Sequence, residues 1–307
     1  MKRATDQVRG PFSWEYHMTR WTLGIIGGSG LYALDGLADV RTESVRTPWG
    51  APSAPLTRGA LNGVELVFLP RHGAGHAIPP SDIPFRANIA ALKQAGCTDI
   101  LSISACGSLR QGLPPGHFVM VDQYVDRTVG RERSFFGTGC VAHVPLAQPV
   151  CARLAALAAD AGEAEGLPVT RGGTYLAMEG PQFSTRAESD LYRQWGMDVI
   201  GMTNMPEARL AREAELPYAS IAMVTDYDCW RDEGESVDVA SVLAVMQSNT
   251  KGARRLLDRL TARLADLPRA ASPDGIETCL DTAIITPPAA RDPEVVERLR
   301  SIAARVL

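Results

Sequence analysis

Short apolar runs recur along the chain and alternate with longer stretches in which apolar residues return at helical spacing. The short runs are almost continuously apolar, as expected of strands that are covered on both faces, whereas the longer stretches fit amphipathic helices. We therefore expect strands at residues 22–26, 64–69, 100–104, 118–121, 174–178, 199–202 and 219–224. We expect helices at residues 85–95, 149–161, 186–195, 206–213, 239–264 and 293–306. This alternation predicts an α/β fold with a largely parallel or mixed sheet.

Chain length and one change in composition indicate how these elements are grouped. A chain of 307 residues fits one large α/β domain. Residues 268–274 are rich in Ala, Pro, Ser and Gly, which is typical of a linker. We therefore expect an N-terminal tail at residues 1–21, a single domain at residues 22–265, and a linker with a helical appendage at residues 266–307.

Composition and charge exclude several classes of function. The net charge is −4 and the isoelectric point is near 5.8, so no large cationic surface is available for nucleic acid. The apolar runs are too short to cross a membrane, and residues 1–21 lack the apolar stretch of a signal peptide. The six cysteines form no CxxC pair, which favours reduced thiols in a cytoplasmic protein over a zinc site or a redox dithiol.

Three turns in the first third of the chain follow predicted strands and carry groups that suit an anion. The glycine-rich turn at residues 24–30 includes the Ser29 hydroxyl, and Arg71 and His72 follow the second strand. Ser104 and Ala105 open a third turn of small residues, through which a ligand can approach the backbone. Backbone N–H groups and a guanidinium both bind phosphate well. Each turn read alone is equally compatible with an ordinary tight turn or a solvated basic loop.

Three further segments in the second half of the chain also end strands. Phe183 is either a core residue or a ring that stacks on a planar base, and the hydroxyls of residues 184 and 185 can cap the next helix. The Thr203 hydroxyl can cap a helix or contact phosphate. Asp226 and Asp228 point the same way if the strand continues through them, which fits a working site, an exposed acidic loop or a cation site.

Taken together and in this order, these segments resemble the trimeric purine nucleoside phosphorylase family, most of all its branch acting on S-methyl-5′-thioadenosine. The resemblance spans about residues 23–257 and includes the long stretches 105–110 and 219–230. It implies a nucleoside phosphorylase type of fold, in which helices surround a central mixed and partly barrel-like sheet. It also implies a homotrimer that uses inorganic phosphate as co-substrate and needs neither a metal nor an organic cofactor.

The resemblance also implies roles for individual residues. Phosphate would be bound by six residues, namely Ser29, Arg71, His72, Ser104, Ala105 and Thr203. The nucleoside would be contacted by Met202 beside the ribose, by Phe183, Ser184, Asp226, Tyr227 and Asp228 around the base, and by Val239 and Val242 at the 5′ group. His143 matches a histidine that the family provides to the active site of the neighbouring subunit.

The pair of Ser184 and Asp226 indicates an adenine nucleoside. Relatives that act on inosine or guanosine have Glu and Asn at these two positions, and a carboxylate accepts from a 6-amino group but repels a 6-oxo group. Asp226 is the expected catalytic acid at N7 of the leaving base, which needs a raised pKa. The remaining alternatives are a broader adenosine or purine nucleoside phosphorylase, a hydrolase, and a non-catalytic nucleoside-binding protein.

Overall fold

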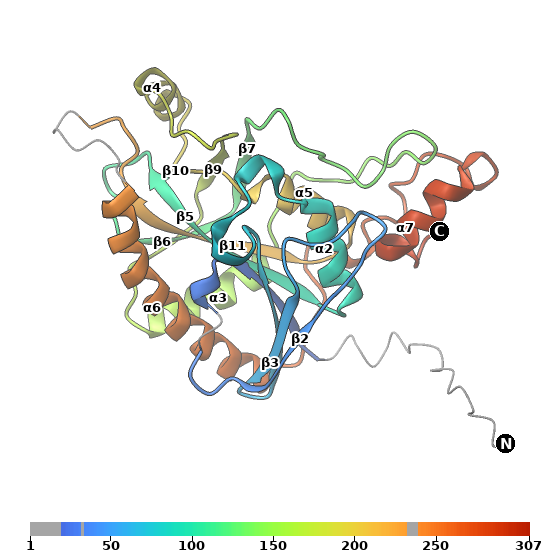
Figure 1. The fold of residues 1–307 in the computed structure, drawn as a ribbon, viewed down its shortest axis with the longest axis horizontal. Coiled ribbons are helices and arrows are strands. Elements are labelled where there is room, and N and C mark those ends of the chain that lie inside the picture. The colour runs from blue at the N-terminus through green and yellow to red at the C-terminus, as the bar shows by residue number, and fades with distance from the viewer. Residues whose placement is uncertain (1–19, 32–33, 232–238) are drawn as a thin grey trace.

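The computed structural model describes residues 20–31, 34–231 and 239–307, while the side chains of Ser29 and of residues 239–241 lie outside that description. The described residues form one mixed sheet of eleven strands with helices on both sides (Figure 1). Most of the tail expected at residues 1–21 is outside the described residues. The expected α/β fold with a central mixed sheet is confirmed.

The strands follow the predicted apolar runs, with four additions. The predicted strands are β1 (Thr22–Gly27), β4 (Val64–Pro70), β5 (Asp99–Ser108), β6 (Phe118–Val121), β9 (Thr174–Ala177), β10 (Val199–Gly201) and β11 (Tyr218–Asp226). The additions are β2 (Ala38–Glu43), β3 (Leu56–Leu61), β7 (Gln123–Asp126) and β8 (Val169–Arg171). The added strands carry polar or half-exposed residues and so lack the continuous apolar pattern.

Part of the sheet closes on itself. Strand β5 pairs with both β11 and β10, β11 pairs with β6, and β10 pairs with β9. The β6–β7 segment then runs parallel to the β8–β9 segment, because β6 pairs with β8 and β7 pairs with β9. These pairings form a ring, which gives the partly barrel-like sheet that the resemblance implied. Strands β1, β4, β3 and β2 extend the sheet from β5.

Alternating strand residues build two large cores, one on each face of the sheet, and a third, smaller cluster joins α4 to β9 and β10. One core joins the sheet to α2 (Phe85–Gln94), α5 (Asn204–Glu213) and α7 (Pro293–Ala303). The other joins it to α3 (Ala152–Ala164) and α6 (Val239–Ala265). In Figure 1, α3 and α6 lie on the left and α2, α5 and α7 on the right. No helix among the described residues is long and apolar enough to cross a membrane.

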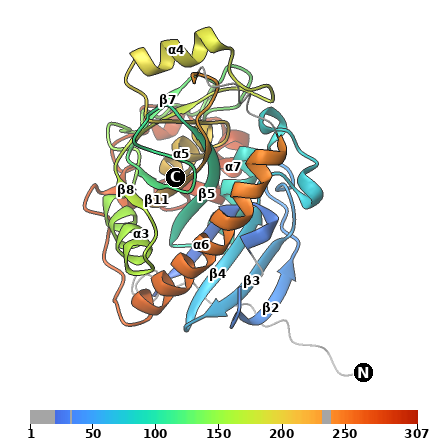
Figure 2. The ribbon, with the colours of Figure 1, turned by 90° about the vertical axis from the view of Figure 1, so that its left-hand side faces the viewer.

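Helix α4 (Arg186–Gln194) stands apart from these layers, above the strands in Figure 2. Thr185 begins it with a capping box, in which its hydroxyl accepts from the backbone N–H of Glu188 and the Glu188 carboxylate accepts from the backbone N–H of Thr185. The cap fixes where the chain turns from the residues that follow β9 into the helix. Residues 180–185, which include Phe183 and Ser184 that are expected at the base, are therefore anchored at their C-terminal end by the cap.

Candidate active site

The parallel strands β1, β4, β5 and β11 bring their carboxyl ends to one edge of the sheet. The turn after β1, Arg71 after β4, the last residues of β5 and Asp226 at the end of β11 therefore lie at this edge. Ligands of α/β proteins bind at such an edge. Each of the six segments selected from the sequence contains or follows the end of a strand in this ring or beside it. The fold therefore brings together functional side chains that are far apart in the sequence.

Arg71 is buried and anchors this edge. Its Nε donates to Oε2 of Glu207 at 3.2 Å, and its Nη1 and Nη2 donate to the carbonyl oxygens of Ile103 and Ile26. Nη2 also donates to Oγ of Ser102 at 2.6 Å. The guanidinium thus has a carboxylate counter-ion and ties β1, β5 and α5 together, which the sequence did not indicate. If Arg71 contacts phosphate, it does so with a positive charge that the Glu207 carboxylate already balances.

His72 is neutral at physiological pH. Burial lowers the pKa of its imidazole to about 4, and the positive charge of Arg71 acts in the same direction, while a hydrogen bond to the backbone of Ile78 opposes the shift. Nδ1 lies 2.9 Å from the Ile78 carbonyl oxygen, which can only accept, so Nδ1 carries the proton. Nε2 is then an acceptor, so the ring can accept a hydrogen bond from a P–OH group but cannot donate one to phosphate.

Ser104 and Ala105 lie inside β5 and not in the turn that the sequence predicted, because β5 continues to Ser108 and pairs with β11 as far as Gly107. Ser104 is buried, and its hydroxyl donates to Oδ1 of Asn204 at 3.2 Å. Thr203 precedes α5 in the N-cap position, but its side chain makes no capping hydrogen bond. Its buried hydroxyl is therefore not used to cap the helix, which leaves the alternative of an anion contact. Ala105 is half-buried beside Ser104.

Asp226 lies against the backbone of β5. A Cβ atom on Gly107 would come within 2.9 Å of Oδ1 of Asp226, so the absence of a side chain at Gly107 is what admits the carboxyl group. Oδ2 accepts from the Thr225 hydroxyl at 2.7 Å, and Oδ1 accepts from the backbone N–H of Asp228 at 2.8 Å. Burial raises the pKa of Asp226, whereas these two hydrogen bonds oppose the rise. The raised pKa suits a group that gives a proton to a leaving base.

Asp228 is buried and lies beside Asp226. Burial raises its pKa, and the charge of Asp226 adds to the rise. The hydroxyls of Ser189 and Ser184 act against this rise, although Oδ2 makes no close hydrogen bond with the described residues. A buried carboxyl oxygen without a partner is costly, and a ligand that brings a donor removes the cost. The pair of carboxyl groups is thus a partly shielded acidic site and not an exposed loop.

The other residues expected at the base differ in their burial and in the contacts they already make. Ser184 is buried, and its backbone carbonyl oxygen accepts from the Cys229 thiol. Phe183 is 49% exposed, which rules out the core role that the sequence had left open. Tyr227 is half-buried, and its hydroxyl donates to the carbonyl oxygen of Gln111. Its ring contacts the Arg231 guanidinium at 3.5 Å, so this ring already has a partner.

Met202 connects the base-side and phosphate-side segments. A Cβ atom on Gly180 would come within 2.5 Å of Sδ of Met202, so the methionine packs directly on the turn after β9. Gly180 also has φ +70°, a conformation that favours glycine. Met202 therefore lies between residues 180–185 and Thr203, as a residue beside the ribose would.

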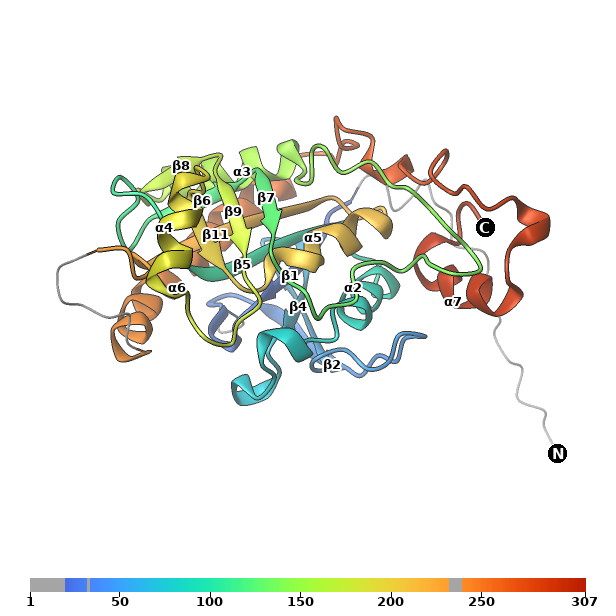
Figure 3. The ribbon, with the colours of Figure 1, turned by 90° about the horizontal axis from the view of Figure 1, so that it is seen from above.

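Four of the expected residues are not placed at this edge by the described structure. His143 is exposed, and its backbone N–H donates to the carbonyl oxygen of Ala283, so it lies beside the C-terminal segment. Figure 3 shows the chain after β7 running across to that segment, far from α4. The side chains of Ser29 and Val239 lie outside the described residues, while Val242 is half-buried on α6.

Sequence reasoning missed Arg131 and the role of Glu179. The Arg131 side chain is 0% exposed and its Nε pairs with Oε1 of Glu179 at 3.1 Å. Glu179 also accepts from the Ser81 hydroxyl and from the backbone N–H groups of Val129 and Gly130. These hydrogen bonds outweigh the effect of burial and lower its pKa to about 2. Arg131 comes from a segment without a motif, so only tertiary structure reveals it.

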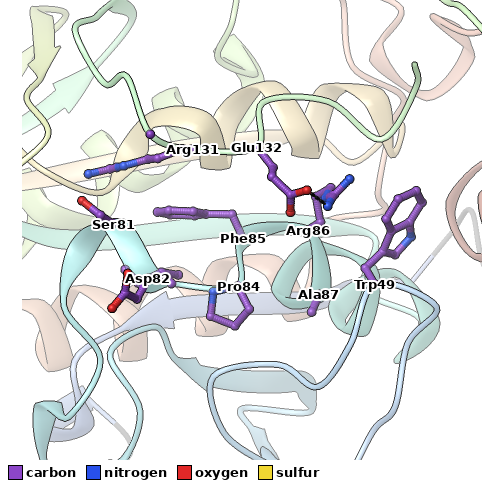
Figure 4. A pocket seen from close by; sticks show the side chains of 11 residues that line it. Trp49, Ser81, Asp82, Pro84, Phe85, Arg86, Ala87, Arg131 and Glu132 are labelled. Atoms are coloured by element: carbon purple, nitrogen blue, oxygen red, sulfur yellow. Dashed lines mark ion pairs between the residues drawn. The ribbon is translucent and has the colours of Figure 1, made fainter. Parts of the chain in front are cut away.

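A cavity of about 220 Å³ lies beside Arg131 (Figure 4). Ser81, Phe85 and Arg131 line it together with Trp49 and the ion-paired Arg86 and Glu132. None of the expected catalytic or binding residues lines this cavity. It therefore adjoins the residues that support the site but does not coincide with the strand-end edge.

Comparison with known proteins agrees with this geometry. The family model described as the Phosphorylase superfamily matches residues 22–262. The S-methyl-5′-thioadenosine phosphorylase of Bradyrhizobium diazoefficiens is 56% identical, over 94% of this chain and 99% of its own. The enzyme of the same name from Cereibacter sphaeroides is 55% identical, over 93% of this chain and 98% of its own.

Solved structures show the same similarity. The crystal structure of a methylthioadenosine phosphorylase from an antarctic soil metagenomic library matches with a TM-score of 0.86 and 42% identity, over 92% of this chain and 99% of its own. Methylthioadenosine phosphorylase from Schistosoma mansoni in complex with adenine matches with a TM-score of 0.80 and 38% identity, over 86% of this chain and 99% of its own. The chain belongs to the Phosphorylase superfamily and, within it, to the S-methyl-5′-thioadenosine phosphorylases.

Proposed function

We propose that the protein cleaves S-methyl-5′-thioadenosine with inorganic phosphate, giving adenine and 5-methylthioribose 1-phosphate. The observation that carries this proposal is the pair of the half-buried Asp226 and the buried Asp228 at the strand-end edge, with a raised pKa for each carboxyl group. The relatives named above bear the same activity in their names. A nucleoside laid across this edge would have its base at the carboxyl pair and its sugar at Met202.

The proposed mechanism is dissociative. The glycosidic bond stretches first, so positive charge builds on the ribosyl ring, and phosphate then attacks C1′ from the opposite face. Asp226 in its protonated form donates to N7 of adenine as the bond breaks, and general acid help of this kind is worth about 10²–10⁴ in rate. The unpartnered oxygen of Asp228 would accept from the 6-amino group.

We assign phosphate binding to backbone and hydroxyl groups near the strand ends, at Ser29, Ser104, Ala105 and Thr203. The Ser104 hydroxyl, which donates to Asn204, would turn toward phosphate. Arg71 contributes its charge from behind, in balance with Glu207. Nε2 of His72 would accept a hydrogen bond from a P–OH group, since the Nδ1 proton is donated to the carbonyl oxygen of Ile78. The phosphate would thus be bound as a protonated anion, beside an arginine whose positive charge is already balanced by Glu207.

Omitting phosphate tests the reaction class. With methylthioadenosine and purified protein, adenine release should require phosphate and should yield the sugar phosphate in equal amount. Adenine release that continues at the same rate without phosphate would identify a hydrolase. Binding of the nucleoside without any cleavage would identify a non-catalytic protein.

We further propose a homotrimer in the cytoplasm. His143 is exposed in the single chain and matches a residue that relatives provide to the neighbouring subunit. The 5′ pocket would then combine Val239 and Val242 of one subunit with His143 of the next. All six cysteines are free, which suits a reducing compartment. The mass in solution, measured by light scattering, tests the trimer.

A further inference from the structure

Arg131 uses its whole guanidinium to join two segments of the candidate site. Nη1 donates to the carbonyl oxygens of Met202 at 2.5 Å and Met205 at 2.7 Å, at the junction of β10 and α5. Nη2 donates to the carbonyl oxygens of Glu179 at 2.7 Å and Met178 at 3.5 Å, after β9. Together with the bond from Nε to the Glu179 carboxylate, each of the five N–H groups has an acceptor.

The surroundings of Arg131 hold its guanidinium in one place. Its plane lies over the Phe85 ring, with 5.3 Å between the guanidinium carbon and the ring centroid (Figure 4). The carboxylate of Glu179 balances its charge and is itself fixed by Ser81 and by the backbone of Val129 and Gly130. A fully buried and fully paired guanidinium has a single low-energy position, so it acts as a rigid spacer.

The two joined segments serve different ends of the substrate in the proposed reaction. Residues 180–185 follow Glu179 and carry Phe183 and Ser184 on the base side. Met202 and Thr203 lie on the sugar and phosphate side, and Met202 packs on Gly180. Catalysis by alignment depends on such spacing, because a displacement of about 1 Å costs on the order of 10²-fold in rate.

We propose that Arg131 is a positioning residue that sets the distance between the base-side segment and the sugar–phosphate segment. It touches no substrate atom in this account and acts through the backbone carbonyl groups of Met202 and Glu179. The inference rests on the proposed phosphorolysis, because that reaction is what requires both segments at once. Loosening the spacer weakens the binding of nucleoside and of phosphate together, although neither ligand contacts Arg131.

The test compares Arg131→Lys with Arg269→Lys. Arg269 is a matched control, since its side chain is only 3% exposed and pairs with Asp99 and Glu277 at the opposite end of β5. Lysine keeps the charge in both variants but cannot reproduce the planar set of donors. The KM for methylthioadenosine and for phosphate, kcat and the thermal midpoint are measured for both variants and the wild type.

A positioning role predicts that Arg131→Lys raises both KM values by about tenfold and lowers kcat/KM by about 10²-fold. Arg269→Lys should lower the thermal midpoint while both KM values stay within twofold of the wild type. Loss of folded protein lowers the apparent kcat but leaves KM unchanged, so the two KM values separate positioning from stability. Unchanged KM values in Arg131→Lys would overturn the proposal.

Glu179→Gln provides a second variant if Arg131→Lys does not fold. It leaves the Arg131 side chain and its carbonyl acceptors intact but removes the counter-charge, so both KM values should rise by a smaller factor. If they do not rise, the proposal fails. Failure of the proposed function is a separate result, because the wild-type protein itself would then release no adenine from methylthioadenosine in the presence of phosphate.

Discussion

At the scale of single residues, the proposed function depends on the protonation of Asp226. Its half-buried carboxyl group lies against Gly107, and burial raises its pKa, which favours the protonated form that the proposed acid requires. Asp226→Asn keeps the shape and the hydrogen bond from Asp228 but cannot donate an acidic proton. We expect its kcat for methylthioadenosine to fall by about 10²–10⁴ with an unchanged thermal midpoint. Asp226→Asn activity near that of the wild type would remove Asp226 from the mechanism.

A substitution at Thr225 can shift the pKa of Asp226 without replacing Asp226 itself. Its hydroxyl donates to Oδ2 of Asp226 at 2.7 Å and stabilises the ionised form. Thr225→Val removes this donor, so the pKa of Asp226 should rise further and the protonated acid should persist to higher pH. The alkaline limb of the kcat profile should therefore move to higher pH, whereas Thr225→Ser should match the wild type. Movement to lower pH would show that loss of the Asp226 proton is not what limits activity.

At the scale of elements, the segment after β7 is tied to α5 through a buried carboxyl group. Glu213 on α5 accepts from the Ser134 hydroxyl at 2.7 Å and from the backbone N–H of Phe135 at 2.6 Å. Burial raises the pKa of Glu213 to about 7, against the effect of these hydrogen bonds. The same segment carries Arg131, so its attachment to α5 bears on the site.

This pKa makes a pH-dependent prediction about stability. A glutamate with a raised folded-state pKa binds its proton more tightly when folded, so its contribution is present below about pH 4.5 and is lost as the pH rises to about 7. Glu213→Gln cannot ionise. The free energy of unfolding of Glu213→Gln minus that of the wild type should therefore increase from pH 5 to pH 8, by up to about 3 kcal/mol. Denaturant titrations at both pH values measure it, and a constant difference would contradict the assignment.

The elements also show which parts of the fold can be predicted from the sequence. The apolar runs predicted β1, β4, β6 and β11 to within two residues, because burial on both faces leaves a strong pattern. Strand β2 is exposed throughout and exists through its pairing with β3, which no local pattern reveals. Likewise, the strand-end side chains could be chosen from the sequence, whereas Arg131 could not. Its acceptors are backbone carbonyl groups from distant segments, and these leave no signature in residue types.

At the scale of the whole molecule, the C-terminal appendage belongs to the main core. Leu280, Leu299 and Ile302 are almost fully buried in the core beneath α2. Arg305 pairs with Glu215, and Arg269 with Asp99. The expected division at residue 265 therefore does not separate two hydrophobic cores, and we propose that residues 266–307 unfold together with the rest.

Leu299→Ala tests whether residues 266–307 unfold together with the rest of the protein. Removing a fully buried leucine side chain costs about 2–5 kcal/mol, so the whole protein should lose that much stability in one transition. The exposed neighbour Arg300 is a control, and Arg300→Ala should change stability by less than about 0.5 kcal/mol. A separate early transition that leaves the remaining structure intact would show that the appendage folds independently.

The most direct measurement of the central claim compares kcat/KM for methylthioadenosine, adenosine and inosine at saturating phosphate. The claim is that Asp226 and Asp228 recognise adenine, Asp226 at N7 and the buried Asp228 at the 6-amino group. It predicts that methylthioadenosine is the best substrate and that inosine is poorer by at least about 10²-fold, because a 6-oxo group leaves the acidic pair without a donor. Inosine turnover equal to or faster than that of methylthioadenosine would contradict it.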